Sequence, residues 1–376
     1  MHKSHFLTTK KNTEDTMSIE SDLRKDGIRV VDILDTMSVN RIAHNIAAKL
    51  CDTFPELCFN ESDLFAKLSR LSMYRATMPD GMAEANYFYK NTSIYFNEKI
   101  AFEDLEEFAI HECIHYIQEI KDKKNNLIRM GLCNFDNLKI VGMGLNEAAV
   151  QYVTSKIIGI EKDYVKYFGV SFKTVSPSYY PLECNLIEQM TYITGESVLY
   201  DSTFTSNDKF KNTFIKQTSE DAYDKIEYYI DQILELEENI IKLGNKFSSF
   251  DERNKKVDKI VSKTDSCKIK IAEYYEKAQN TIIKSYFDKS FKLIKDLEEL
   301  DNYRRKLEHY GELIGRTEGY TFFDDYYTEK MSALEHKCNV LENGGIETAL
   351  EVKKSNKFVS WFRAIKNLLT GDKINN

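Results

Sequence analysis

Residues 101–121 read AFEDLEEFAIHECIHYIQEIK, and this stretch decides how the rest of the chain is interpreted. Its apolar and polar residues alternate at helical spacing and predict an amphipathic α-helix from about Phe102 to Lys121. Four acidic residues fall in its first turns, where the helix dipole stabilises negative charge: Glu103, Asp104, Glu106 and Glu107. The residues that carry chemistry then lie in the middle of this helix.

Two histidines in this helix are spaced so that both could bind one metal ion. His111-Glu112-Cys113-Ile114-His115 is an HExxH sequence, and residues i and i+4 project from the same face of a helix, one turn apart. Both imidazoles can therefore converge on a single metal ion, while Glu112 is rotated by about 100° towards the position of a bound water. The alternative is that His111 and His115 are ordinary surface or core histidines on an acidic helix.

A β-rich segment precedes the helix. Residues 87–89 and 93–96 have strand composition, and Lys90-Asn91-Thr92 between them has the chemistry of a hairpin turn. We expect strand 93–96 to lie beside the cleft, where its edge could pair with an extended substrate. An ordinary sheet strand is an equally good interpretation.

A third metal ligand is expected from another helix, because a catalytic zinc site needs three protein ligands and an open position. Gly142 and Gly144 introduce a predicted helix from Leu145 to about Ile158. Glu147 lies near its start, among small residues that allow two helices to approach closely. Glu147 is therefore the candidate third ligand.

With HExxH followed by Asn146-Glu147-Ala148, the chain resembles the gluzincin, or thermolysin-like, branch of the zincin metallopeptidases over roughly residues 85–205. The resemblance implies that His111, His115 and Glu147 bind one Zn²⁺ per chain and that Glu112 is the general base. It also implies an endopeptidase, which hydrolyses peptide bonds with a metal-activated water.

The chain departs from thermolysin in two ways. Glu147 follows His115 by 32 residues, a spacing nearer to that of clostridial neurotoxin light chains. Gln151 stands where thermolysin-type enzymes have an aspartate that orients a ligand histidine, and a neutral amide raises the basicity of an imidazole less. Gln151 and Asn146 are nevertheless the residues expected to support the ligands.

Other candidate groups are less strongly indicated. Tyr200 and Arg75 are candidates for stabilising an oxyanion by their chemistry alone. Residues 81–86 loosely resemble the Gly-x-Met-Glu-Asn element of zinc aminopeptidases, with an extra alanine, which makes an exopeptidase the less favoured alternative.

The fold class expected is α+β: a zincin-like domain with a small sheet, an active-site helix and a glutamate helix, followed by a mostly helical, coiled-coil-like region. The helical region is indicated by apolar residues at the a and d positions of a heptad pattern, a seam that we interpret as ending at Gly244. Its members are Ile226, Tyr229, Ile233, Leu236, Ile240 and Leu243. The expected divisions are a leader at 1–25, the metallopeptidase domain at 26–215, a helical hairpin at 216–318 and a helical tail at 319–376. Residues 216–318 could bind a partner protein or form a homo-oligomer.

Composition and the absence of some sequence patterns limit the expected partners and cellular location of the protein. The net charge of −8 over 376 residues disfavours a nucleic-acid-coating role. Seven scattered cysteines, no recognisable signal peptide and no apolar span predict a cytoplasmic protein. High usage of Lys, Asn, Ile and Tyr fits an AT-rich bacterial genome. The basic amphipathic stretch at 353–369 could associate with a membrane, although a docked terminal helix is favoured.

Two functions follow from these observations. The first is a zinc endopeptidase that acts on a protein or peptide substrate. The alternative is an interaction or scaffold protein that works through its C-terminal helices, with a structural or degenerate zincin domain.

Overall fold

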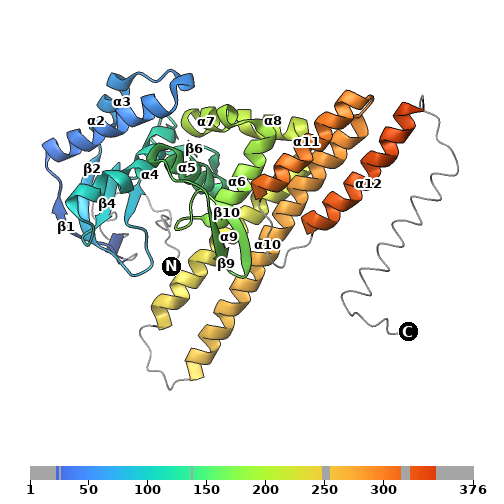
Figure 1. The fold of residues 1–376 in the computed structure, drawn as a ribbon. Coiled ribbons are helices and arrows are strands. Elements are labelled where there is room, and N and C mark those ends of the chain that lie inside the picture. Colours follow the sequence, from blue (N-terminus) through green and yellow to red (C-terminus); the bar gives the residue numbers. More distant parts are fainter. Residues whose placement is uncertain (1–22, 25–26, 137–138, 248–254, 315–321, 344–376) are drawn as a thin grey trace. The chain divides into compact units, whose positions relative to one another are not determined.

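The computed structural model describes residues 23–24, 27–136, 139–247, 255–314 and 322–343 (Figure 1). They form a mixed α+β structure, as the sequence predicts. The chain divides into two compact units, one extending to Tyr286 and the other beginning at Phe287. Most of the expected leader and the basic stretch 353–369 lie outside the described residues. Among the described helices, none is long and apolar enough to cross a membrane.

The first sheet has four strands in the order β1-β2-β4-β3. Their bounds are β1 Arg29–Ile33, β2 Ser72–Thr77, β3 Ala85–Phe88 and β4 Ser93–Asn97. Strand β4 pairs in parallel with β2 and antiparallel with β3, so it has a partner on both sides. The prediction that strand 93–96 presents an edge beside the cleft is therefore wrong, and β3 is the edge strand at that end.

Helix α4 (Leu105–Gln118) packs on β3 and β4 of this sheet, and helices α2 (Thr36–Thr53) and α3 (Glu61–Leu68) pack on α4 and on each other. Two short 3₁₀ turns, η1 (Pro55–Leu57) and η2 (Phe102–Asp104), lie in the connections before α3 and α4. Helix α2 begins at Asp35, whose carboxylate accepts a hydrogen bond from the Ser38 amide at 2.7 Å. Helix α4 is shorter than predicted, because Glu119–Lys121 leaves the helix and pairs as a strand.

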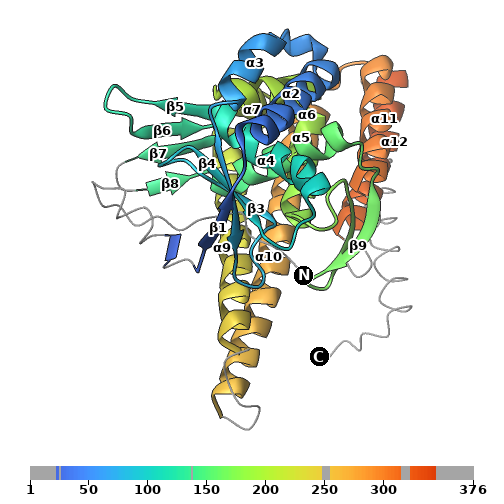
Figure 2. The same ribbon diagram turned by 90° about the vertical axis from the view of Figure 1, so that its left-hand side faces the viewer.

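A second, antiparallel sheet connects α4 to the next long helix, α5 (Met143–Ile158). Its strands lie in chain order: β5 Glu119–Lys121, β6 Leu127–Met130, β7 Cys133–Asp136 and β8 Lys139–Val141. Figure 2 shows these strands side by side. The described strands of this sheet lie within the long step between His115 and Glu147, and α5 after them packs beside α4.

Three helices follow a hairpin formed by β9 (Asp163–Tyr167) and β10 (Val170–Thr174). They are α6 (Pro181–Thr194), α7 (Glu196–Thr205) and α8 (Lys209–Gln217). Helices α6 and α7 are separated by one residue. The break falls at Gly195, whose φ of +92° is open to glycine and strained for other residues.

Helix α9 (Glu220–Phe247) carries the predicted apolar seam and continues past Gly244. Its buried residues include Ile226, Ile230 and Ile233. Ile230 lies against Gly144 of α5, where an added Cβ would approach the Ile230 carbonyl oxygen to 2.9 Å. Helix α9 therefore packs on the glutamate helix of the same chain. Helix α10 (Lys255–Leu293) follows and crosses the boundary between the two units.

The second unit contains the end of α10, α11 (Leu297–Ile314) and α12 (Phe322–Glu342). Aromatic rings form its core: the Phe287 ring packs edge-on against Tyr303 and Tyr310, with centroids 5.8 and 5.3 Å apart. The domain boundaries drawn from the sequence, at 215/216 and 318/319, remain predictions.

Candidate metal centre

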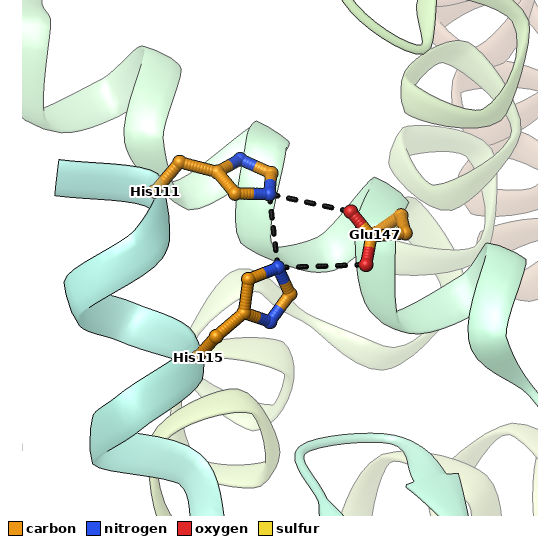
Figure 3. Close-up of side chains that lie close together, drawn as sticks. All are labelled: His111, His115 and Glu147. Carbon is orange, nitrogen blue, oxygen red and sulfur yellow. Dashed lines mark hydrogen bonds and ion pairs between the residues drawn. The ribbon is translucent and has the colours of Figure 1, made fainter. Parts of the chain in front are cut away.

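Three side chains from two helices converge in the first unit. His111 and His115 point from α4 towards Glu147 of α5 (Figure 3). The two Nε2 atoms are 3.0 Å apart, His111 Nε2 is 3.3 Å from Glu147 Oε2, and His115 Nε2 is 3.4 Å from Glu147 Oε1. The group is buried, with each residue no more than 4% exposed.

These separations fit a tetrahedral metal ion. Bonds of about 2.0–2.1 Å from zinc to nitrogen and oxygen place neighbouring ligand atoms roughly 3.3 Å apart. Two imidazoles and one carboxylate are also a donor set that catalytic zinc uses. A metal ion could therefore be held by His111, His115 and Glu147 with little rearrangement.

Local packing explains why the two helices meet here. Helix α5 presents Ala148 and Ala149, both fully buried, next to Glu147. Its first turn is fixed from α9, because the Asp231 carboxylate accepts hydrogen bonds from the backbone N–H groups of Gly142 and Gly144 at 2.9 and 2.8 Å. Glu147 thus sits on a helix whose start is anchored by a carboxylate from a distant part of the sequence.

Burial and the charges of the neighbouring group members together set the pKa values of Glu147 and His115. Burial acts to raise the pKa of Glu147, but the two imidazoles outweigh it and hold this pKa well below its usual range. Burial acts to lower the pKa of His115, but the Glu147 charge and hydrogen bond outweigh it and raise this pKa. The pocket therefore keeps the Glu147 carboxylate negatively charged although it is buried.

Glu112 lies beside this group without being one of its three converging residues. It is 1% exposed, and its Oε2 accepts a hydrogen bond from the backbone N–H of Tyr87, on edge strand β3, at 2.5 Å. Burial raises the pKa of Glu112 to about 7, helped by the Glu147 charge and opposed by both histidines. A carboxyl group with this pKa can both take up and release a proton near neutral pH.

The two supporting residues expected from the sequence both contact the histidines. Gln151 Oε1 is 2.9 Å from His111 Nδ1, one turn of α5 beyond Glu147. Asn146 Nδ2 is 3.5 Å from His115 Nδ1 and also donates to Gln118 Oε1 at 3.3 Å. Gln118, on the last turn of α4, is a member of this network that the sequence reasoning did not identify.

The two expected oxyanion candidates have their contacts elsewhere. Arg75, on β2, donates from Nη2 to the carbonyl oxygens of Glu98 and Ile100. Tyr200, on α7, packs against Phe54 and forms a hydrogen bond with Glu196. The structure therefore does not bring either residue to the histidine and glutamate group.

Two other tyrosines lie closer. The Tyr180 ring is stacked near His111, with centroids 6.3 Å apart. The Tyr179 hydroxyl donates to Glu84 Oε2, and burial raises its pKa to about 12, helped by the charges of Glu107 and Glu112. Tyr179 is thus a protonated hydroxyl near Glu112. No local sequence pattern marks Tyr179, because its hydrogen bond to Glu84 joins segments 95 residues apart.

Comparisons with models of protein families, with curated proteins and with solved structures found no match for this chain.

Proposed function

We propose that this protein is a zinc-dependent hydrolase of peptide bonds. The convergence of His111, His115 and Glu147 within hydrogen-bonding distance of one another carries the proposal. In it, these three residues hold one Zn²⁺ and Glu112 acts as the general base. The arrangement agrees with the gluzincin resemblance of the sequence, and we extend the proposal to a zincin-type fold for the first unit.

Zinc bound there would supply Lewis-acid polarisation of a carbonyl and a water molecule whose pKa is lowered to about 7. The chain supplies the proton transfers. Glu112 Oε atoms receive a proton from the attacking water and return it to the leaving amine, and a carboxyl pKa near 7 suits both steps. Tyr179, whose pKa the Glu112 charge helps to raise, is the candidate for donating a hydrogen bond to the developing oxyanion, in place of its bond to Glu84.

The sheet favours an extended peptide as substrate. Strand β3 is the edge strand next to α4, and its Tyr87 N–H points out of the sheet to Glu112. In an antiparallel ladder, the N–H and C=O of one residue point to the same side, so the Tyr87 carbonyl also faces outward. Main-chain pairing along this edge would bring a peptide bond alongside Glu112.

Zinc content and cleavage measured together test the proposal. Wild type, Glu112→Gln and His115→Ala would be compared for bound zinc and for cleavage of a broad peptide library. We expect wild type to bind zinc and cleave, Glu112→Gln to bind zinc but lose at least about 100-fold in rate, and His115→Ala to lose both. Zinc binding without cleavage in wild type would instead favour a structural metal site in a scaffold protein.

A further inference from the structure

We propose that a groove between α9 and strand β8 binds an extended segment of a partner protein that carries several Lys or Arg side chains. The groove has a volume of about 580 Å³, and its walls are one face of α9, Ile140 and Val141 of β8, and Met143 of α5. All of these residues belong to the first unit. The candidate ligands of the metal centre do not line it, so the inference goes beyond the proposed function and does not depend on it.

The groove is acidic. Five carboxylates of α9 line it: Asp224, Glu227, Asp231, Glu235 and Glu238. Their spacing of three, four, four and three residues places them on one face of the helix, and the buried apolar seam of α9 lies on another. None of the described residues that line the groove carries a positive charge.

Lysines outside the groove pair with two of these carboxylates. Glu238 Oε2 lies 3.1 Å from Lys242 Nζ, and Asp224 Oδ1 lies 3.9 Å from Lys211 Nζ. Burial nevertheless raises the pKa of Glu238, and the Glu235 charge adds to the rise, against the effect of Lys242. The pairing with Lys242 therefore does not cancel the negative charge around Glu238, and a cationic occupant would reduce the repulsion between the carboxylates.

The carboxylates are spread too widely to hold a single metal ion. Asp224 and Glu238 are 14 residues apart, which corresponds to about 21 Å along an α-helix. Within the described part of the chain, the one group of three or more potential ligand atoms within 4.8 Å of one another is that of His111, His115 and Glu147. The charge pattern of the groove thus fits a longer occupant with several separate positive groups.

The groove also has surfaces that suit Lys and Arg side chains. Ile140 is 40% exposed, and the long hydrocarbon stems of Lys and Arg cover such apolar surface. Tyr228 lines the groove and is 52% exposed. Its ring packs edge-on against Tyr229 and Tyr274, with centroids 5.7 and 6.2 Å apart. An exposed ring supported in this way, next to carboxylates, can bind a guanidinium or ammonium group against its face.

Strand β8 favours a peptide over other polycations. It is the last strand in the order β5-β6-β7-β8, and among the described strands it pairs only with β7 (Figure 2). An edge strand directs N–H and C=O groups outward, where an extended peptide can pair with them. A polyamine has the positive charges but no peptide groups, so it cannot make these hydrogen bonds.

The test is fluorescence anisotropy with the full-length protein and a short labelled peptide in which Arg alternates with Val, so that the Arg side chains share one face of an extended chain. A chelator in the buffer excludes zinc, so the result does not depend on metal binding or on cleavage. We expect this peptide to bind and the same peptide with Glu in place of Arg not to bind.

Charge reversal locates the binding site. Glu235 is exposed, and Glu235→Lys is expected to weaken binding of the Arg peptide at least about 10-fold, because it places a like charge in the groove. Glu308→Lys is the matched control, since it makes the same change of net charge at an exposed glutamate of α11 that does not line the groove. The control is expected to change the affinity by less than about 2-fold.

No binding of the Arg peptide, or equal losses in Glu235→Lys and Glu308→Lys, would overturn the inference. An Arg peptide with N-methylated peptide groups cannot donate main-chain hydrogen bonds and is expected to bind more weakly. Undiminished binding of the N-methylated peptide, or equally tight binding of spermine, would show that the groove recognises charge alone and would reject the protein segment as its occupant.

Discussion

Two glutamates of the first unit, Glu147 and Glu237, are buried to a similar degree, but the pKa of the first is lowered and the pKa of the second is raised. Glu147 on α5 is 3% exposed and faces two imidazoles, which hold its pKa well below the usual range. Glu237 on α9 is 1% exposed and lies beside Glu183 of α6 and Tyr167 of β9. Burial raises the pKa of Glu237 to about 8.

The difference lies in the partners and not in the burial. An imidazole can carry positive charge or offer a lone pair, so Glu147 sits where a cation is favoured. A second carboxyl group and a phenol offer Glu237 no positive charge, so burial favours its neutral, protonated form. A buried acid indicates a metal site only when lone pairs from other residues converge on the same point.

The largest expected effect comes from removing an imidazole. His111→Ala should weaken zinc binding by more than the roughly 10- to 100-fold typical of supporting residues, because a direct ligand is lost. Isothermal titration with zinc measures it. His44→Ala, at an exposed histidine, is the control. Glu183→Gln should leave zinc affinity unchanged. If Glu183→Gln lost as much zinc affinity as His111→Ala, the metal site could not be distinguished from the buried carboxyl group of Glu237.

The packing of α5 on α9 is the next test. Gly144→Ala would place a Cβ within 2.9 Å of the Ile230 carbonyl oxygen and should lower the free energy of unfolding by about 1–3 kcal/mol. Chemical denaturation measures this loss. Gly244→Ala, in a helix with no atom within 4 Å of the added Cβ, should instead be neutral or stabilising by up to about 1 kcal/mol. Equal losses in both variants would contradict the packing argument.

The anchor at the start of α5 should matter less. Asp231→Ala removes the acceptor of two backbone N–H groups and should cost about 0.5–2 kcal/mol of stability. The same denaturation experiment applies. Asp224→Ala, whose exposed carboxylate lies 3.9 Å from Lys211 Nζ, should change stability by less than about 0.5 kcal/mol.

The last test concerns the pH dependence of stability. The pKa of Glu237 in the folded chain, about 8, lies above the 4.5 of an ordinary glutamate, so folding retains a proton between these values. The contribution of this group to stability is full below pH 4.5 and is lost as the pH rises towards 8. Glu237→Gln should therefore gain thermal stability relative to wild type as the pH rises from 5 to 8. An unchanged difference between the two proteins over that range would contradict the raised pKa.

The sequence predicted those parts of the site that depend on local spacing. An i, i+4 pair such as His111 and His115 shares a helix face whatever surrounds it. The α+β class and the helix around Glu147 followed from similar periodic patterns. Gln118 and Tyr179 could not be found in this way, because the role of each depends on partners brought together by tertiary packing.

The errors have related causes. Glu119–Lys121 has acceptable helix composition, and only its pairing with β6 makes it a strand. The composition of β4 suits an edge strand and a central strand equally well. Its parallel partner, β2, lies some twenty residues earlier in the sequence. Sheet order depends on contacts that a single sequence does not reveal.

Zinc stoichiometry tests the central claim most directly. Wild type and Glu147→Gln would be stripped with a chelator, reloaded with zinc, separated from free metal and analysed for metal per chain. We predict one zinc per wild-type chain and clearly less in Glu147→Gln. No retained zinc in wild type, or the same amount in both proteins, would contradict a metal centre formed by His111, His115 and Glu147.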